Sequence, residues 1–305
     1  MSPCTKPIIG THRPLCGVES CDNPMHRVSN IEGLIPHYTV HLIEEDKSKN
    51  TIRSYLADIK TFVKWIGNIP PIKIKALDIA DYRDELFTAG KSPATIRRAL
   101  VTLQRLFDWA IKQGAMLENP AVNIKPIQQE PLAPRSLAVE EQETLMMTVQ
   151  RIGTDRDKAL IALMINTGLR VSEVTALRTE DVSDTVTVRH GKGGKQRIVP
   201  LNKPARRAMR TYLANHEDEM LFLSMKGKPL SDRGVRYILD KYTDAAKMDR
   251  ISPHILRHTC ATNMRLAGQP LERIQAILGH TNINTTARYT IPSENDLRAA
   301  VESVA

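Results

Sequence analysis

The stretch SPHILRHTCATNMRLAGQPLERIQAILGHTNINTTARY, residues 252–289, decides both the fold class and the chemistry expected of this chain. Ser252 and Pro253 are typical of a helix start, because a hydroxyl caps the first turn and proline suits its first position. A helix that begins here places His254 and Arg257 on one face, three residues apart. The stretch therefore predicts a helix that presents an imidazole and a guanidinium together.

The rest of the same stretch contains two further helix boundaries. Gly268 predicts the end of the first helix, Pro270 begins a second, and Gly279 predicts the end of that one. His280 follows this second end directly, and Tyr289 lies nine residues further along. Histidine, arginine and tyrosine together are the residue types that phosphoryl transfer with a tyrosine nucleophile requires.

Five short motifs occur in one order along the chain. They are Thr167–Glu173 (TGLRVSE), Gly191–Lys195 (GKGGK), His254–Arg257 (HILR), Leu278–His280 (LGH) and Tyr289. In composition and order these motifs resemble those of the tyrosine recombinases, the family of phage integrases and Xer-type recombinases. Each motif alone would be a weak signal, because ion pairs and packed tyrosines are common. The five in order make a specific one.

The resemblance implies a role for each principal side chain. Tyr289 would attack the scissile phosphorus, because a phenol forms a phosphotyrosine bond that conserves the energy needed for religation. Arg170 and Arg257 would hold the phosphate, since guanidinium groups keep their charge and donate paired hydrogen bonds. Lys192 would protonate the leaving 5′ oxygen, and Lys195 is the rival residue for that role.

Three more side chains complete the implied site. His254 would assist proton removal, and His280 would form a hydrogen bond to a phosphate oxygen. Glu173, three residues after Arg170 on the same helical turn, would orient that arginine. The spacing of His254 and His258 mimics a metal pair, but the intervening residues include a permanent cation and lack the glutamate of a zinc protease. The glycine-rich motif likewise lacks the spacing of a nucleotide-binding P-loop.

Length and charge limit the overall class. The chain has 305 residues, which exceeds the usual size of a single core and predicts two domains. Lysine and arginine exceed aspartate and glutamate by nine, and the pI is about 9.4, which favours a polyanionic partner. We find no signal peptide and no apolar run of about eighteen residues. The sequence thus predicts a cytoplasmic, nucleoid-associated bacterial protein without a membrane partner.

The domain prediction has four parts. Residues 1–28 form an N-terminal arm, 29–124 a helical core-binding domain of the SAM-like type, 125–135 a proline-rich linker, and 136–305 a catalytic domain with a C-terminal tail helix. The predicted fold class is mainly α, with a small β-hairpin in the catalytic domain whose tip carries the glycine-rich motif. The resemblance implies that the two domains form a clamp on DNA.

Basic residues recur on the helices predicted before the linker. Apolar residues follow a helical period from Ile52 to Ile66, Asp78 predicts the cap of a shorter helix, and Ser92 with Pro93 predicts the start of a long one. The candidates for contact with a phosphate backbone are Lys47, Lys49, Arg53, Lys60, Arg97, Arg98 and Arg105. A solvated helical face is the alternative interpretation for any one of them.

The N-terminal arm holds three of the four cysteines. His12, Cys16, Cys21 and His26 offer four ligands to a tetrahedral zinc ion, although their spacing matches no established zinc motif. A disordered arm with incidental thiols is the favoured alternative. The reaction itself is expected to need no metal and no other cofactor.

The resemblance also implies a reaction and its partners. We expect DNA cleavage and rejoining through a 3′-phosphotyrosyl intermediate, with strands exchanged between two duplex sites and without ATP. The implied partners are double-stranded DNA with an inverted-repeat core site and further copies of this chain, joined as a homotetramer by the C-terminal tail in trans. Integration, excision, cointegrate resolution and dimer resolution stay open, with a mobile-element recombinase favoured. A type IB-like topoisomerase and a DNA-binding regulator are the alternative functions.

Overall fold

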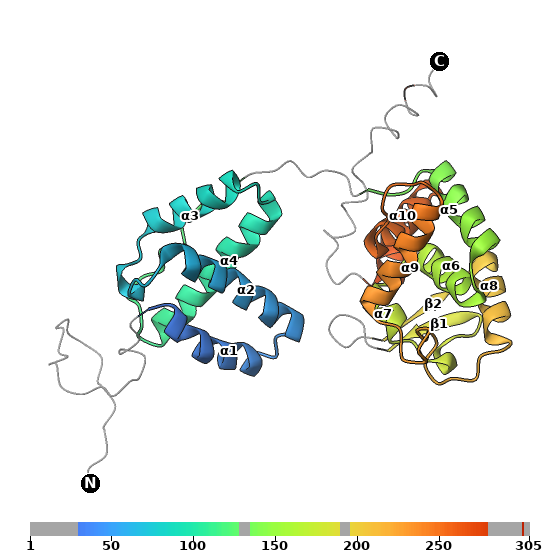
Figure 1. Cartoon of the computed structure of the whole chain (residues 1–305), viewed down its shortest axis with the longest axis horizontal. Helices are drawn as coiled ribbons and strands as arrows, with labels where there is room; N and C mark the ends of the chain where they lie inside the picture. The colour runs from blue at the N-terminus through green and yellow to red at the C-terminus, as the bar shows by residue number, and fades with distance from the viewer. Residues whose placement is uncertain (1–29, 128–134, 190–195, 280–300, 302–305) are drawn as a thin grey trace, which may run out of the picture. The chain divides into compact units, whose positions relative to one another are not determined.

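The computed structural model describes residues 30–127, 135–189, 196–279 and 301. The chain separates into two compact units, Met1–Glu130 and Pro131–Ala305 (Figure 1). Each unit has a hydrophobic core of its own. The described part of the chain is mainly helical and contains one two-stranded antiparallel sheet. The predicted fold class, mainly α with a small β-hairpin, is therefore confirmed.

Four α-helices make up the described part of the N-terminal unit. They are α1 (Ile35–Glu44), α2 (Lys49–Ile66), α3 (Ala76–Thr88) and α4 (Pro93–Lys112), with short 3-10 turns at Glu32–Leu34 and Pro71–Lys73. The hydroxyls of Ser48 and Ser92 cap α2 and α4 by accepting backbone hydrogen bonds at 3.1 and 3.2 Å. Phe62 lies at the centre of the bundle, with ring centroids 5.0 Å from Tyr82 and 6.3 Å from Phe107.

Helix α3 corrects one prediction. It begins at Ala76, so Asp78 is the third residue of the helix and not its cap. The Asp78 carboxylate instead accepts a hydrogen bond from the backbone N–H of Lys75 at 2.8 Å. An acidic residue suits either position, because both bring a carboxylate to the unpaired N–H groups of the first turn.

An ion pair between a buried carboxylate and a half-exposed arginine joins α2 to α4. Asp58 accepts hydrogen bonds from Nε and Nη2 of Arg98 at 3.0 and 2.8 Å, and one from the hydroxyl of Thr102 at 3.2 Å. Three donors compensate for the burial of this carboxylate. The guanidinium of Arg98, a candidate for DNA contact, is therefore already bound within the unit.

The described part of the C-terminal unit contains seven α-helices, a 3-10 turn and the sheet. They are α5 (Val139–Ile152), α6 (Asp155–Thr167), α7 (Val171–Thr175), the turn Thr179–Asp181, β1 (Thr185–Val188), β2 (Arg197–Pro200), α8 (Lys203–Leu213), α9 (Asp232–Ala245), α10 (Pro253–Leu266) and α11 (Leu271–Leu278). Strands β1 and β2 are antiparallel, with Val188 opposite Arg197. None of the helices that the structure describes in either unit is long and apolar enough to span a lipid bilayer.

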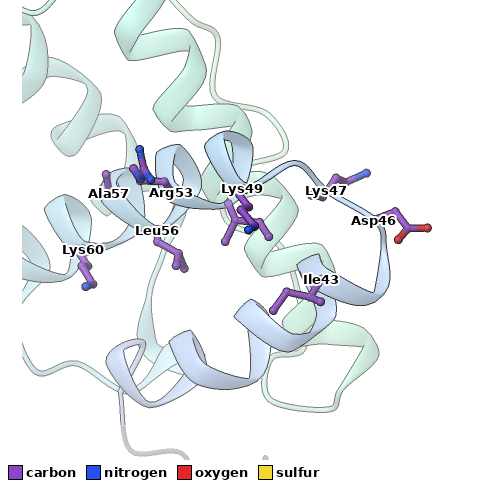
Figure 2. A pocket seen from close by; sticks show the side chains of 9 residues that line it. Ile43, Asp46, Lys47, Lys49, Arg53, Leu56, Ala57 and Lys60 are labelled. Carbon is purple, nitrogen blue, oxygen red and sulfur yellow. The ribbon is translucent and has the colours of Figure 1, made fainter. Parts of the chain in front are cut away.

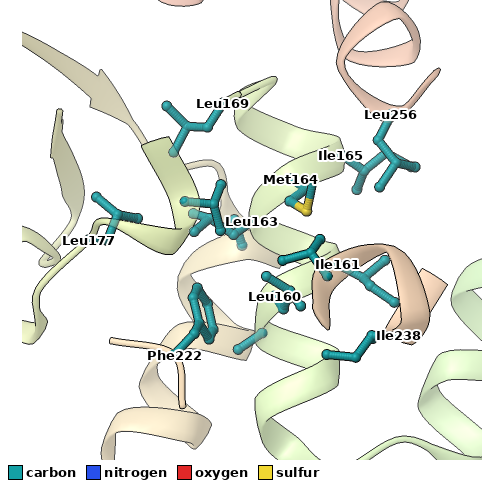
Figure 3. Close-up of a cluster of buried hydrophobic side chains, with 14 of the residues drawn as sticks. Leu160, Ile161, Leu163, Met164, Ile165, Leu169, Leu177, Phe222, Ile238 and Leu256 are labelled. Carbon is teal, nitrogen blue, oxygen red and sulfur yellow. The ribbon is translucent and has the colours of Figure 1, made fainter. Parts of the chain in front are cut away.

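Helix α6 is the centre of the C-terminal unit. The consecutive residues Ala159–Ile165 are all buried, and apolar side chains from several other elements surround them (Figure 3). A helix that is apolar on every side is shielded from water only when other elements pack against every side. Helices α8 and α10 pack against it. Its C-terminal end is therefore held at a fixed place, and the candidate site is built there.

Candidate active site

Arg170 lies at the junction between α6 and α7. Helix α6 ends at Gly168, whose φ of +63° is left-handed, and Arg170 is the residue that precedes the first turn of α7. The carboxylate of Glu173 accepts hydrogen bonds from the backbone N–H and from Nη1 of Arg170, both at 2.8 Å. The two residues are in contact, although Arg170 caps the helix and does not lie within its first turn.

Arg257, from α10, is the most deeply buried of the site's described arginines, with 3% of its surface exposed. Its Nη1 donates to the carbonyl of Gly168 at 2.6 Å, and its Nη2 donates to the carbonyl of Leu278 at 2.8 Å. Carbonyl groups at helix C-termini lack partners within the helix and carry partial negative charge. The guanidinium therefore joins the end of α6 to the end of α11.

The end of α11 is held by three arginines from three different elements. The successive carbonyls of Ile277–Gly279 accept, in order, hydrogen bonds from Arg197, Arg257 and Arg170 at 3.0, 2.8 and 3.1 Å. His280 is the next residue in the sequence. The arginine cluster thus fixes the point from which the segment bearing His280 and Tyr289 departs.

Sequence reasoning does not identify Arg197, the first residue of β2. Its Nη1 and Nη2 donate to the two carboxylate oxygens of Glu173 at 2.9 and 2.7 Å. The sequence signal is slight, because a cation at the start of a β-like run, opposite the apolar Val188, is ordinary. The contact joins residues 24 positions apart and depends on the tertiary fold.

Glu173 is an ionised carboxylate between two arginines. Burial by itself would raise the pKa of this carboxyl group, but hydrogen bonds from Arg197 and Arg170 outweigh burial and lower the pKa below its ordinary value. Glu173 is therefore charged at neutral pH and can hold both guanidinium groups.

His254 is an exposed residue in the first turn of α10. Its ring centroid is 5.9 Å from that of His258. Partial burial, followed by the positive charges of Arg257, Arg170 and Arg236, lowers the pKa of His254 below its ordinary value. The ring is consequently neutral at physiological pH and is able to accept a proton.

Several candidate residues lie outside the described part of the chain. Among the catalytic candidates these are Lys192, His280, Tyr289 and the rival Lys195; among the zinc candidates they are His12, Cys16, Cys21 and His26. Their roles stay predictions. The described arginines, Glu173 and His254 form one cluster around the ends of α6 and α11.

The candidate DNA contacts of the N-terminal unit have different surroundings. Four of them line a groove between the end of α1 and α2, together with apolar side chains (Figure 2): Lys47, Lys49, Arg53 and Lys60. Arg97 is exposed on α4. Arg98 is bound by Asp58, and Cζ of Arg105 lies 5.8 Å from the ring centroid of Tyr55. The groove thus holds the densest group of candidate cations.

Comparison with known proteins identifies the class to which this fold and site belong. The model of the phage integrase family matches residues 135–296, and the model of the phage integrase N-terminal SAM-like domain matches residues 35–114. The chain belongs to the phage integrase family. The tyrosine recombinase XerC of Thermodesulfovibrio yellowstonii is 31% identical, over 86% of this chain and 93% of that protein. The XerC of Bacillus pumilus is 33% identical, over 89% of this chain and 95% of that protein.

Solved structures share the fold. The integrase of transposon Tn1549, in complex with a circular intermediate DNA, superposes with a TM-score of 0.74, over 91% of this chain and all of that one, at 20% identity. A lambda integrase dimer bound to a COC′ core site gives a TM-score of 0.74, over 88% and 78%, at 19% identity. At such identities the likeness concerns the architecture.

Gly168→Ala should destabilise the C-terminal unit much more than Gly227→Ala. Both glycines are left-handed, with φ of +63° and +68°, so alanine costs about 1–2 kcal/mol of backbone energy at each. At Gly168 the added Cβ would also lie 2.5 Å from Cδ2 of Leu278, whereas nothing lies within 4 Å at Gly227. Urea unfolding measures the loss in free energy of unfolding for each variant, and the difference between the two losses gives the cost of the clash. Equal losses would contradict the packing of α11 against this turn.

Proposed function

We propose that this chain is a site-specific tyrosine recombinase that cleaves and rejoins double-stranded DNA. The observation that carries the proposal is the pair of permanent cations, Arg170 and Arg257, held at the end of α11 in a chain of the phage integrase family. Two neighbouring guanidinium groups suit a phosphate on which negative charge builds up during substitution. In the sequence, Tyr289 follows this helix end by ten residues.

The proposed reaction assigns one step to each side chain. The oxygen of Tyr289 bonds to phosphorus while the bond from phosphorus to the 5′ oxygen breaks, which leaves a 3′-phosphotyrosyl link. Lys192 gives its proton to the leaving oxygen, and His254, neutral because of its lowered pKa, assists removal of the phenol proton. His280 forms a hydrogen bond to a phosphate oxygen. A 5′ hydroxyl from the partner duplex then displaces the tyrosine and completes the exchange.

These steps are proposed to need neither ATP nor a divalent metal. Arg170 and Arg257 supply the positive charge that a metal ion supplies in other phosphoryl transfers. The phosphotyrosyl bond conserves the energy of the broken phosphodiester, so religation needs no separate energy source.

The N-terminal unit is proposed to contact the phosphate backbone through the groove of α1 and α2. Lys49, Arg53 and Lys60 lie along this groove, and each contact with a phosphate would release counterions. Arg97 on α4 is proposed to add to this surface. Arg98 and Arg105 are expected to contribute less, because other side chains already engage their guanidinium groups. In this proposal residues 29–124 and 136–305 form a clamp, joined by the linker 125–135.

The proposed assembly is a homotetramer on two DNA sites, each with an inverted repeat. Exchange between two duplexes cleaves four strands, which requires four nucleophiles. The segment Asn295–Val304 has apolar residues at helical spacing and is proposed to bind a neighbouring protomer in trans. We propose that the protein acts at the nucleoid. Its proposed role is that of a mobile-element recombinase. The XerC relatives favour recombination over a relaxing topoisomerase or a regulator.

Covalent trapping tests the proposal. The protein is incubated with fragmented DNA of its host and denatured, and DNA attached to protein is recovered and sequenced from the attached ends. We expect the ends to share an inverted repeat, and mass spectrometry to find the nucleotide on the peptide that contains Tyr289. Adducts without a shared sequence would favour a topoisomerase, and a complete lack of adducts would contradict the proposal.

A further inference from the structure

All three guanidinium nitrogens of Arg197 donate hydrogen bonds within the protein. Its Nε donates to the carbonyl of Ile277 at 3.0 Å, and its Nη1 and Nη2 donate to Oε1 and Oε2 of Glu173 at 2.9 and 2.7 Å. The side chain is only 13% exposed. Its geometry therefore suits a residue that holds other groups in place.

The two hydrogen bonds from Nη1 and Nη2 of Arg197 matter because the carboxylate of Glu173 binds two arginines. Its Oε1 also accepts from Nη1 of Arg170, and its Oε2 also accepts from the backbone N–H of Arg170, both at 2.8 Å. Without Arg197, each oxygen of this buried carboxylate would lose one partner. Glu173 would then move toward Arg170 or take up a proton. Either change displaces the guanidinium of Arg170.

Arg197 also contacts the segment that Arg170 holds. Gly279 is left-handed, with φ of +67°, and a Cβ placed there would lie 2.7 Å from Nη1 and 2.8 Å from Cζ of Arg197. The guanidinium therefore packs directly on the backbone of Gly279, whose carbonyl accepts the hydrogen bond from Nη2 of Arg170 at 3.1 Å. One side chain from β2 thus sets both the carboxylate and the helix end that orient Arg170.

We propose that Arg197 is a positioning residue for strand cleavage: through Glu173 and the end of α11 it holds Arg170 in the orientation that receives the scissile phosphate. The inference rests on the proposed function. It also links β2, which follows the segment bearing Lys192, to the helix end that precedes His280. A shift of either element would reach Arg170 through Arg197.

Several other charges near Glu173 have partners of their own. Arg178, Asp181 and Arg189 line a pocket with Glu173, Asp232 lies on α9, and α9 also carries Arg236, whose charge helps to lower the pKa of His254. Arg189 binds Asp181 at 2.5 Å, Arg178 binds Glu219 at 2.6 Å, and Asp232 accepts from the hydroxyl of Thr175 at 3.3 Å. Within the described residues, the charged donors to Glu173 are therefore Arg170 and Arg197.

Two substitutions of Arg197 test the inference in single-turnover cleavage of a synthetic duplex that carries the trapped site. Arg197→Gln should lower the cleavage rate about 10²-fold, the effect of a misplaced catalytic group, with little change in the dissociation constant for DNA. Arg197→Lys should restore part of the rate, because it keeps the charge beside Glu173 but not the two hydrogen bonds. In the double variant Arg197→Gln with Glu173→Gln, the fold-loss of cleavage rate should be less than the product of the two single fold-losses.

The pH dependence separates positioning from a general loss of structure. The pKa of Glu173 is lowered by hydrogen bonds, first among them those from Arg197, so Arg197→Gln should raise it. Glu173 holds Arg170 best when its carboxylate is ionised. This interaction is lost as the pH falls through the pKa of Glu173. The acid limb of the cleavage profile should therefore move to higher pH in Arg197→Gln.

Arg189→Gln is the matched control, because Arg189 follows β1 directly and binds Asp181 and Glu180 instead of the site. It should cleave at the wild-type rate. Wild-type cleavage by Arg197→Gln, or equal loss in Arg189→Gln, would overturn the inference. A wild-type chain that forms no adduct would instead overturn the proposed function. Carbon-13 NMR titration measures the pKa of Glu173 directly, without relying on cleavage. The carboxyl signal of Glu173 is assigned by its absence in Glu173→Gln. An unchanged pKa of Glu173 in Arg197→Gln would overturn the inference.

Discussion

A chain with Tyr289→Phe should bind its DNA site as the unmodified chain does, yet form no covalent adduct and exchange no strands. The substitution deletes one oxygen atom, the one proposed to bond to phosphorus. Arg170 and Arg257 can only donate hydrogen bonds, so they would still hold the phosphate but could not attack it. The loss should be complete, because the phenyl ring offers no weaker nucleophile in place of the phenol.

The matched control for this experiment is Tyr237→Phe. Tyr237 lies on α9 of the same unit and is 74% exposed, so loss of its hydroxyl should change neither adduct formation nor stability. DNA binding is measured by fluorescence anisotropy, and adducts are measured on denaturing gels. Adducts that persist in Tyr289→Phe would assign the nucleophile to another residue.

Arg257→Gln should lose both activity and stability. Removal of a preorganised donor to developing negative charge lowers rates by about 10²–10³-fold. Arg257 also binds the carbonyls of Gly168 and Leu278, and it is 3% exposed. Buried groups left without partners cost about 1–3 kcal/mol. We therefore expect a lower free energy of unfolding together with the slower cleavage.

Arg257→Lys separates the charge of this residue from its geometry, since lysine keeps the charge but cannot donate to two carbonyls in a fixed plane. It should bind DNA better than Arg257→Gln and cleave much more slowly than the wild type. Arg250→Gln is the control, because Arg250 forms a surface ion pair with Asp240 and is 79% exposed. Urea unfolding and single-turnover cleavage measure both quantities. A fully stable and active Arg257→Gln would contradict the site described here.

The helices with strong local signals could be predicted from the sequence. Ser92 with Pro93, and Ser252 with Pro253, mark the starts of α4 and α10, and in both cases the serine side chain accepts the capping hydrogen bond. Gly279 marks the end of α11, where its left-handed backbone requires glycine. These signals are local, because each depends on residues within one helical turn.

The connections within the site could not be predicted in this way. The contact of Arg197 with Glu173, and that of Arg98 with Asp58, each join residues far apart in the sequence. Nothing in the spacing of an arginine tells whether its partner is a phosphate or a buried carboxylate. The motif order indicates which residues belong to the site, whereas the fold determines which of them hold the others.

The fixed end of α11 limits how far the proposed nucleophile can travel. Gly279 is anchored by the arginine cluster, and Tyr289 lies ten positions later in the sequence. A fully extended chain spans at most about 3.3–3.6 Å per residue, so the tether reaches no further than roughly 35 Å. The Cα atom of Tyr289 therefore lies inside that radius around the anchor of its protomer, and the phenol oxygen can reach only one side-chain length beyond it. The length of this tether, as much as the chemistry at its end, restricts which strand a protomer can cut.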